Sequence, residues 1–172
     1  MRCVFINGTV GVGKTSVAEE VGDRLTRAGV PNAVIDLDWL RRAWPAPGED
    51  PFNQQLEMDN LSAITPNFSR AGVEVMILAG VIERAEDRVL YEAALKDSQL
   101  TVLRLDAPLE ILRQRLQSRH VPGDSALNWH LNRAGELQSI LHAADVDDAV
   151  IDTGDLDVKA TAAVVLGLAN LP

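Results

Sequence analysis

The sequence predicts an α/β fold in which helices cover both faces of a five-stranded parallel sheet, giving three layers. Short apolar runs rich in Val, Ile and Leu alternate along the whole chain with longer stretches of helical periodicity. The runs are apolar at consecutive positions, which is typical of strands that are buried on both faces. With 172 residues, of which 47% are hydrophobic, the chain has the size of a single domain over 1–172.

The first half of the chain begins with the run "RCVFI", which predicts a strand over 2–6. Periodic apolar residues then predict a helix over 14–28, and "NAVIDL" predicts the second strand over 32–37. The stretch "DWLRRAW" predicts a short helix over 38–44, which the proline-rich loop at 45–51 would end.

The middle of the chain contains two further strands. Residues 53–71 have the spacing of a helix, which we expect Pro66 to kink or divide. The run "VEVMILA" predicts the third strand over 73–79, and a helix follows over 84–97. The run "QLTVLRL" then predicts the fourth strand over 99–105.

The last third of the chain repeats this alternation. A helix is predicted over 108–119, with a proline in its first turn where that residue is well tolerated. We expect the stretch that follows, approximately 119–128, to form a short lid. A helix over 126–143, the strand "DAVID" over 148–152 and a final helix over 156–169 complete the predicted fold.

The composition narrows the choice of partners and compartment. A formal net charge of -9 disfavours long nucleic acid as a partner, because phosphate contacts need clustered Lys and Arg. Cys3 is the only cysteine, so an internal disulfide is impossible and a reducing compartment is expected. The sequence has no apolar stretch of the length that spans a bilayer. We therefore expect a cytoplasmic monomer or homodimer with no membrane partner.

The stretch "GTVGVGKTS" over 8–16 fits the pattern G-x-x-x-x-G-K-[ST], and it lies between the first predicted strand and the first helix. In this setting successive backbone N–H groups and the helix dipole bind phosphate oxygens. The Lys14 ammonium would reach the β- and γ-phosphates, and the Thr15 hydroxyl would bind Mg²⁺. The pattern predicts ATP and Mg²⁺ as cofactors, with contacts from Gly8, Val10, Gly11, Val12, Gly13, Lys14, Thr15 and Ser16.

With this motif directly after its first predicted strand, the chain resembles the small-molecule and nucleotide kinase branch of the P-loop proteins. That branch includes adenylyl-sulfate kinase, shikimate and gluconate kinases and chloramphenicol phosphotransferase-like proteins. The resemblance covers nearly the whole chain as architecture and three segments as motif, "GTVGVGKTS", "DLDWLR" and "RLQSR". It implies a P-loop NTPase fold and an ATP-dependent phosphotransferase that moves the γ-phosphate to a hydroxyl or phosphate of a small molecule.

Two aspartates, Asp36 and Asp38, stand where the second predicted strand ends, on the ligand side of a parallel sheet. Similar Asp-x-Asp pairs occur there in shikimate kinase and adenylyl-sulfate kinase-like enzymes. The resemblance implies that Asp38 contacts the acceptor hydroxyl as base or positioner, and that Asp36 holds Mg²⁺ through water. Arg41 lies one helical turn later and is placed to grip an anionic acceptor. The alternative for Asp38 is a structural role as the cap of the short helix.

Arg115 and Arg119 are four residues apart and so share one helix face. Their spacing is similar to the Arg-x-x-x-Arg that opens the lid of adenylate kinase-like proteins. The resemblance implies that both are catalytic and, together with Lys14, bring positive charge to the transferring phosphate. The alternative is an ordinary solvated face. Related kinases place a loop against the adenine base after the last strand, where Thr153 and Gly154 stand, so we expect these two to bind the nucleotide.

Two other functions stay open beside a small-molecule kinase. The third predicted strand has no aspartate at its end, which disfavours a P-loop hydrolase of the switch or motor type. The N-K-x-D signature of GTPases is also absent, so guanine specificity has no support. A nucleic-acid end kinase would need a basic channel, which the acidic balance disfavours. A nucleotide-binding regulatory ATPase without small-molecule transfer would need neither Asp38 nor Arg119.

Overall fold

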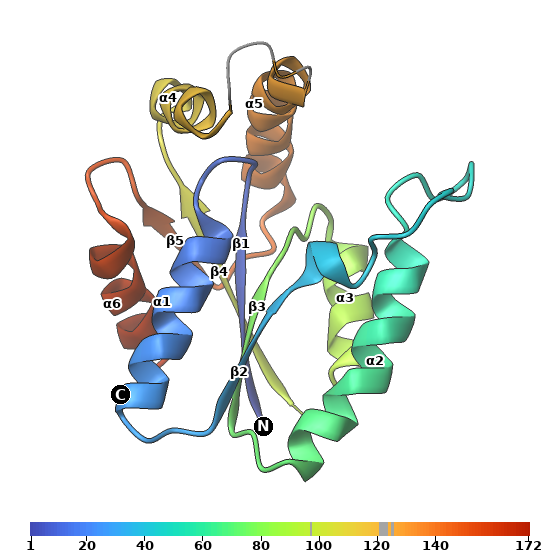
Figure 1. Cartoon of the computed structure of the whole chain (residues 1–172), viewed down its shortest axis with the longest axis vertical. Coiled ribbons are helices and arrows are strands. Elements are labelled where there is room, and N and C mark those ends of the chain that lie inside the picture. Colours follow the sequence, from blue (N-terminus) through green and yellow to red (C-terminus); the bar gives the residue numbers. More distant parts are fainter. Residues whose placement is uncertain (97, 121–123, 125) are drawn as a thin grey trace.

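Five parallel strands form one sheet in the computed structural model of the chain (Figure 1). The structure describes residues 1–96, 98–120, 124 and 126–172. The strand order is β2-β3-β1-β4-β5, so β1 is central and pairs with β3 and β4. Their carboxyl ends therefore meet at one edge of the sheet. The bounds are β1 Arg2–Gly8, β2 Asn32–Asp36, β3 Val75–Ala79, β4 Gln99–Asp106 and β5 Ala149–Asp152.

Helices cover both faces of the sheet, as Figure 1 shows. One face carries α1 (Lys14–Arg27) and α6 (Val158–Leu168), and the other carries α2 (Gln54–Arg70) and α3 (Ala85–Ala94). The predicted three-layer α/β/α fold with a five-stranded parallel sheet is thus confirmed.

Alternate side chains of the central strand serve the two layers. Ile6 of β1 belongs to the apolar cluster under α1 and α6, whereas Phe5 belongs to the cluster under α2 and α3. Both side chains are fully buried, and burying an apolar side chain of this size contributes about 1.5–3 kcal/mol to stability. The strand that precedes the phosphate motif is therefore held rigidly from both sides.

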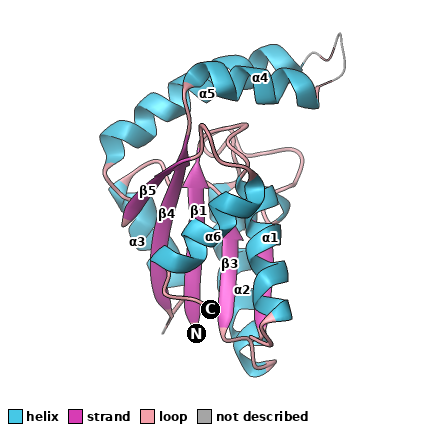
Figure 2. Cartoon of the chain, turned by 90° about the vertical axis from the view of Figure 1, so that its left-hand side faces the viewer, coloured by secondary structure: helices cyan, strands magenta, loops and turns pink. Residues whose placement is uncertain are grey.

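Two helices, α4 (Leu109–Arg119) and α5 (Ala126–Ala144), lie across the carboxyl edge of the sheet (Figure 2). The hydroxyl of Thr9, which directly follows β1, donates a hydrogen bond of 2.8 Å to the Ala134 carbonyl of α5. Leu116 of α4 is buried against the same loop, beside Gly11. These contacts fix the two helices over the loop between β1 and α1.

The prediction of a short helix over 38–44 was wrong. Only a 3₁₀ turn, Leu37–Trp39, forms there, and the chain then runs as turns and loop to α2. Side chains occupy the carbonyls that a helix would use: Asn60 Nδ2 donates to the Leu40 carbonyl at 2.6 Å, and Asn53 Nδ2 donates to the Arg41 and Ala43 carbonyls at 3.0 and 3.1 Å.

The helix predicted over 53–71 is confirmed as α2, and Pro66 does not divide it, because α2 is assigned continuously around this residue. The predicted lid over 119–128 is described only in part: residues 121–123 and 125 lie outside the described residues, α4 ends at Arg119 and α5 begins at Ala126. In the portion of the chain that the structure describes, none of the helices combines the length and the apolar character needed to cross a membrane.

Candidate active site

The loop between β1 and α1 is shaped as an anion cradle. Gly8, Gly11 and Gly13 have φ angles of 141°, 82° and 103°, which side-chain-bearing residues rarely adopt. Gly13 is the N-cap of α1, and among the described residues no side chain caps the N–H groups of the first turn of this helix. These N–H groups and the positive end of the helix dipole favour a bound phosphate.

Lys14 folds over this cradle. Its Nζ donates to the Gly8 and Thr9 carbonyls at 2.9 and 3.1 Å. Burial lowers the pKa of Lys14 to about 8, although the carboxylates of Asp38 and Asp36 act in the opposite direction. In the described part of the chain this ammonium is hydrogen-bonded to neutral carbonyls and poorly solvated, so it is well suited to an anionic ligand. The cradle therefore fits the phosphates of a nucleotide.

The two residues predicted to hold Mg²⁺ lie together. Thr15, in the first turn of α1, donates from Oγ1 to Asp36 Oδ2 at 2.7 Å. The other carboxylate oxygen of Asp36 accepts the backbone N–H of Asp38 at 3.0 Å and caps the 3₁₀ turn. A hydroxyl and a carboxylate beside a phosphate cradle suit Mg²⁺, which binds few protein oxygens and completes its shell with phosphate and water.

Asp38 is held from one side by an arginine. Arg41 donates to Asp38 Oδ1 from Nε at 3.0 Å and from Nη2 at 2.5 Å, while the Asp38 side chain stays 73% exposed. This leaves Oδ2 of Asp38 for another partner. The cap of the 3₁₀ turn is Asp36, so the alternative reading of Asp38 as a helix cap was wrong.

Behind Arg41 lies a buried acidic group that sequence reasoning missed. Glu57 of α2 is 1% exposed, and its Oε2 lies 3.2 Å from Arg41 Nη1. The hydroxyl of Tyr91, from α3, donates to Glu57 Oε1. Burial raises the pKa of the Glu57 carboxyl, and the hydrogen bond from Tyr91 and the charge of Arg41 oppose this rise. Asp38, Arg41, Glu57 and Tyr91 thus form one continuous chain from the surface to the core.

Arg115 ties the phosphate cradle to the loop after β5. Its guanidinium donates to the Val12 carbonyl at 3.3 Å, to Thr153 Oγ1 at 3.1 Å and to the Thr153 carbonyl at 2.7 Å. The Thr153 N–H donates to the Asp106 carbonyl, and the Gly154 N–H donates to Asp152 Oδ1. The N–H groups of both residues predicted to contact adenine are therefore already paired within the protein.

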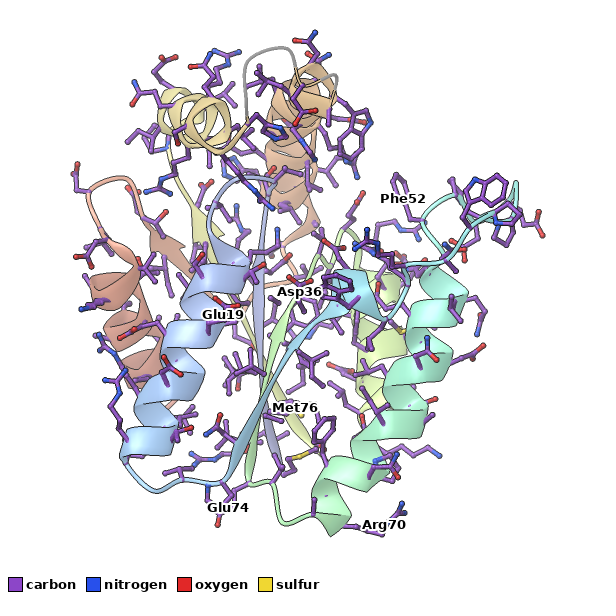
Figure 3. All side chains as sticks on the ribbon, in the orientation of Figure 1. Glu19, Asp36, Phe52, Arg70, Glu74 and Met76 are labelled. Atoms are coloured by element: carbon purple, nitrogen blue, oxygen red, sulfur yellow. The ribbon has the colours of Figure 1, made fainter. Side chains whose placement is uncertain are left out.

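A cavity of about 1150 Å³ lies at the carboxyl edge of the sheet. Figure 3 labels two positions around it: Asp36 at the end of β2, and Phe52 on the loop before α2. Thr153, Gly154, Gly8 and Val12 are not part of its wall. The residues predicted as site residues that do line it are Val10, Gly11, Gly13, Lys14, Thr15, Ser16, Asp36, Asp38, Arg41, Arg115 and Arg119.

A model of the AAA domain family matches residues 4–126, which include the phosphate cradle and the Asp36–Asp38 pair. The chain belongs to the AAA domain family. Among curated proteins, this AAA domain chain is 27% identical over 169 residues to the adenylyl-sulfate kinase of Rhodopirellula baltica, a match that covers 85% of this chain. The match spans only 64% of the length of that relative.

Two solved structures share the fold of this AAA domain chain. The tunicamycin resistance protein of Deinococcus radiodurans superposes with a TM-score of 0.69 at 23% identity, covering 99% of this chain and 96% of the other. The APS kinase of Mycobacterium tuberculosis, solved in complex with AMPPNP and APS, gives a TM-score of 0.62 at 23% identity, covering 98% and 97%. The predicted resemblance to P-loop kinases is confirmed by the family model and the adenylyl-sulfate kinase relative, and these two structures add the likeness of fold.

A pair of glycine variants tests how tightly the cradle of the AAA domain chain is built. At Gly13 a β carbon would meet no atom within 4 Å, so Gly13→Ala costs only backbone strain, about 1–3 kcal/mol. Gly8→Ala has the same kind of backbone strain, and its β carbon would also lie 2.6 Å from the Leu105 carbonyl oxygen. We therefore expect it to lower the free energy of unfolding by about 1–3 kcal/mol more than Gly13→Ala does. Urea unfolding without nucleotide measures both, and equal losses would contradict this packing.

Proposed function

We propose that this chain is an ATP-dependent kinase that transfers the γ-phosphate to a hydroxyl or phosphate of a small molecule. The observation that carries the proposal is that Lys14, the Thr15–Asp36 pair and Asp38 all lie in the wall of one cavity. Arg41 binds one oxygen of the Asp38 carboxylate, Oδ1. A nucleotide-binding module needs the first two features only. The adenylyl-sulfate kinase relative and the APS kinase structure with AMPPNP and APS support the same kind of reaction.

The residues present fit the groups that such a reaction needs. When bound, ATP supplies the phosphoryl group and Mg²⁺ neutralises part of the phosphate charge. Lys14 and the free N–H groups of α1 would hold the phosphates, and Thr15 with Asp36 would hold the metal. Arg119 lines the same cavity and would balance the charge that develops during transfer.

Asp38 would act on the acceptor. Arg41 engages only Oδ1, so Oδ2 is available to orient a hydroxyl and to take its proton. The hydroxyl oxygen then forms its bond to the γ-phosphorus while the bond from that phosphorus to the oxygen of the leaving ADP breaks. The proton resides on Asp38 until it passes to solvent.

The substitution Asp38→Asn tests this role. It should lower acceptor-stimulated ADP release by about 10²–10⁴-fold, because the base is lost, and should change the Kd for Mg-ATP much less. ADP release is measured against pools of metabolites, nucleosides and hydroxylated antibiotics. Asp59→Asn, an exposed position of α2 outside the cavity, is the matched control. Equal losses of turnover and nucleotide affinity would move Asp38 to a structural role, and ATP binding without turnover in any pool would favour a regulatory nucleotide-binding module.

A further inference from the structure

The cavity has a second half beyond the phosphate cradle, and its charges are arranged differently. We call this part of the wall the acceptor half; it begins at Asp38 and continues over the loop before α2, the segment after β3 and the inner side of α5. Its lining includes five carboxylates, Asp38, Glu49, Asp50, Glu83 and Asp87, and three arginines, Arg41, Arg84 and Arg133, together with His130 and Tyr91. The carboxylates of the acceptor half therefore outnumber its arginines, whereas the cradle half carries Lys14, Arg115 and Arg119 against the carboxylate of Asp36.

The arginines of the acceptor half are already matched to carboxylates. Arg41 lies between Asp38 and the buried Glu57, at 2.5 and 3.2 Å. Two carboxylates around one guanidinium leave no net positive charge there for an anionic ligand. An anionic group that took Arg41 for itself would leave Glu57 buried and uncompensated, which is costly.

Arg133 and Arg84 are matched in the same way. Arg133, on α5, pairs with Glu83 and also lies 3.2 Å from Glu136. Arg84 pairs with the buried Asp87 at 2.9 Å. The Arg84 side chain is 65% exposed, so its pair is the weakest of the three and is screened most by salt. Within the described residues, Glu49 forms no ion pair and adds to the negative potential of the wall.

Three exposed aromatic side chains complete the acceptor half. Trp39, Phe52 and Trp129 are 69%, 53% and 53% exposed and come from the 3₁₀ turn, the loop before α2 and α5. Figure 3 shows Phe52 standing out from its loop, and the guanidinium of Arg133 lies 5.8 Å from its ring, so the loop and α5 face the same space. The guanidinium of Arg42 lies over the Trp39 ring, 4.8 Å from its centroid, so Trp39 has a cation on one face. The aromatic surface that stays exposed around the cavity is suited to stacking on a ring.

We propose that the acceptor half binds a ring-containing alcohol that carries no negative charge, stacked against Trp39, Phe52 and Trp129 with its hydroxyl at Oδ2 of Asp38. This inference rests on the proposed kinase function and names the class of its acceptor. Negative carboxylates and open π-faces both favour a cationic or neutral ring over a carboxylate, sulfate or phosphate acceptor. It differs from the sequence-based expectation that Arg41 grips an anionic acceptor, because the Arg41 guanidinium already lies between two carboxylates.

Three probes that differ only in charge test the proposal: para-(hydroxymethyl)benzylamine, para-(hydroxymethyl)benzamide and para-(hydroxymethyl)benzoate. Each is titrated into the full chain with AMPPNP and Mg²⁺, and binding is followed by tryptophan fluorescence and by ligand-observed NMR. The amine and the amide are expected to bind at least about tenfold more tightly than the benzoate. Binding of the benzoate as tightly as the amine, or no binding of any probe, would overturn the proposal.

Two tryptophan variants separate a stacking site from unspecific adhesion. Trp129→Ala should weaken the binding of all three probes. Trp44→Ala is the matched control. Trp44 is 93% exposed and close to Trp39 in the sequence, but it does not line the cavity. Equal effects of the two variants would also overturn the proposal.

A charge variant tests whether the carboxylates of the cavity wall set the preference between the probes. Glu49→Gln should narrow the difference in affinity between the amine and the benzoate, and an unchanged difference would contradict the charge argument. The binding assay does not depend on transfer. If the probes bind with the expected preference but no alcohol stimulates ADP release, the proposed kinase function is refuted and the proposed binding preference stands. If ADP release is stimulated best by anionic alcohols, the proposed acceptor class is refuted and the kinase function stands.

Discussion

Lys14→Ala is expected to lower acceptor-stimulated ATP turnover by about 10²–10³-fold while leaving the protein folded. The Lys14 ammonium lies inside the cradle, and its hydrogen-bond partners among the described residues are the Gly8 and Thr9 carbonyls. Phosphate oxygens would be its first anionic partners there, so its loss removes charge where the transferring group needs it. In the free protein the same ammonium is poorly solvated, and its removal should not lower the free energy of unfolding much. ADP release and urea unfolding measure the two quantities.

The pH dependence of nucleotide binding provides an internal control for this variant. Burial lowers the pKa of Lys14 to about 8, so the free protein loses this charge as the pH rises through that value. Phosphates favour the charged form. The affinity of the wild-type chain for ATP should therefore be full below about pH 8 and fall above it, and Lys14→Ala should lack this fall. Normal phosphate transfer by Lys14→Ala would refute the assignment of the cradle.

The fold follows from local patterns that the sequence displays openly. Buried strands such as Val75–Ala79 are apolar at every position, and the phosphate motif has fixed spacing, so both are visible without a structure. The meeting of Thr15 and Asp36 also follows from the rule that parallel strands end at one edge. The segment 38–44 misleads because its helix-like spacing is overridden by Asn53 and Asn60, which come from a distant helix and its cap.

The parts of the site that could not be predicted depend on contacts between distant elements. Glu57 belongs to no motif; its one signal is its position on the buried stripe of α2, with Met58, Leu61 and Thr65, where an acidic residue is unexpected. That stripe does not reveal that Tyr91 of α3 and Arg41 of the loop supply its partners. For the same reason spacing alone suggested that Arg41 was free for a ligand, and left the contacts of Arg115 with Thr153 unseen.

Glu57→Ala should have the largest effect on stability, a loss of about 3–5 kcal/mol in the free energy of unfolding. The substitution leaves the Tyr91 hydroxyl without its acceptor and Arg41 without the deeper of its two carboxylates. Since Glu57 is 1% exposed, water cannot readily replace either contact. Urea unfolding of the two proteins measures the loss. Asp59→Ala, on the exposed side of the same helix, is the control and should change stability by less than about 0.5 kcal/mol.

A milder pair of variants separates anchoring of Arg41 from simple packing. Tyr91→Phe keeps the ring and removes one hydrogen bond, so its cost should be about 1–3 kcal/mol. Combined with Glu57→Gln, which keeps the side-chain shape, it should cost less than the sum of the two single changes, because both remove parts of one network. If Glu57 anchors Arg41, Glu57→Gln should also lower turnover while leaving the Kd for ATP nearly unchanged, because Arg41 then holds Asp38 less firmly. Strict additivity with normal turnover would show that Glu57 serves the core alone.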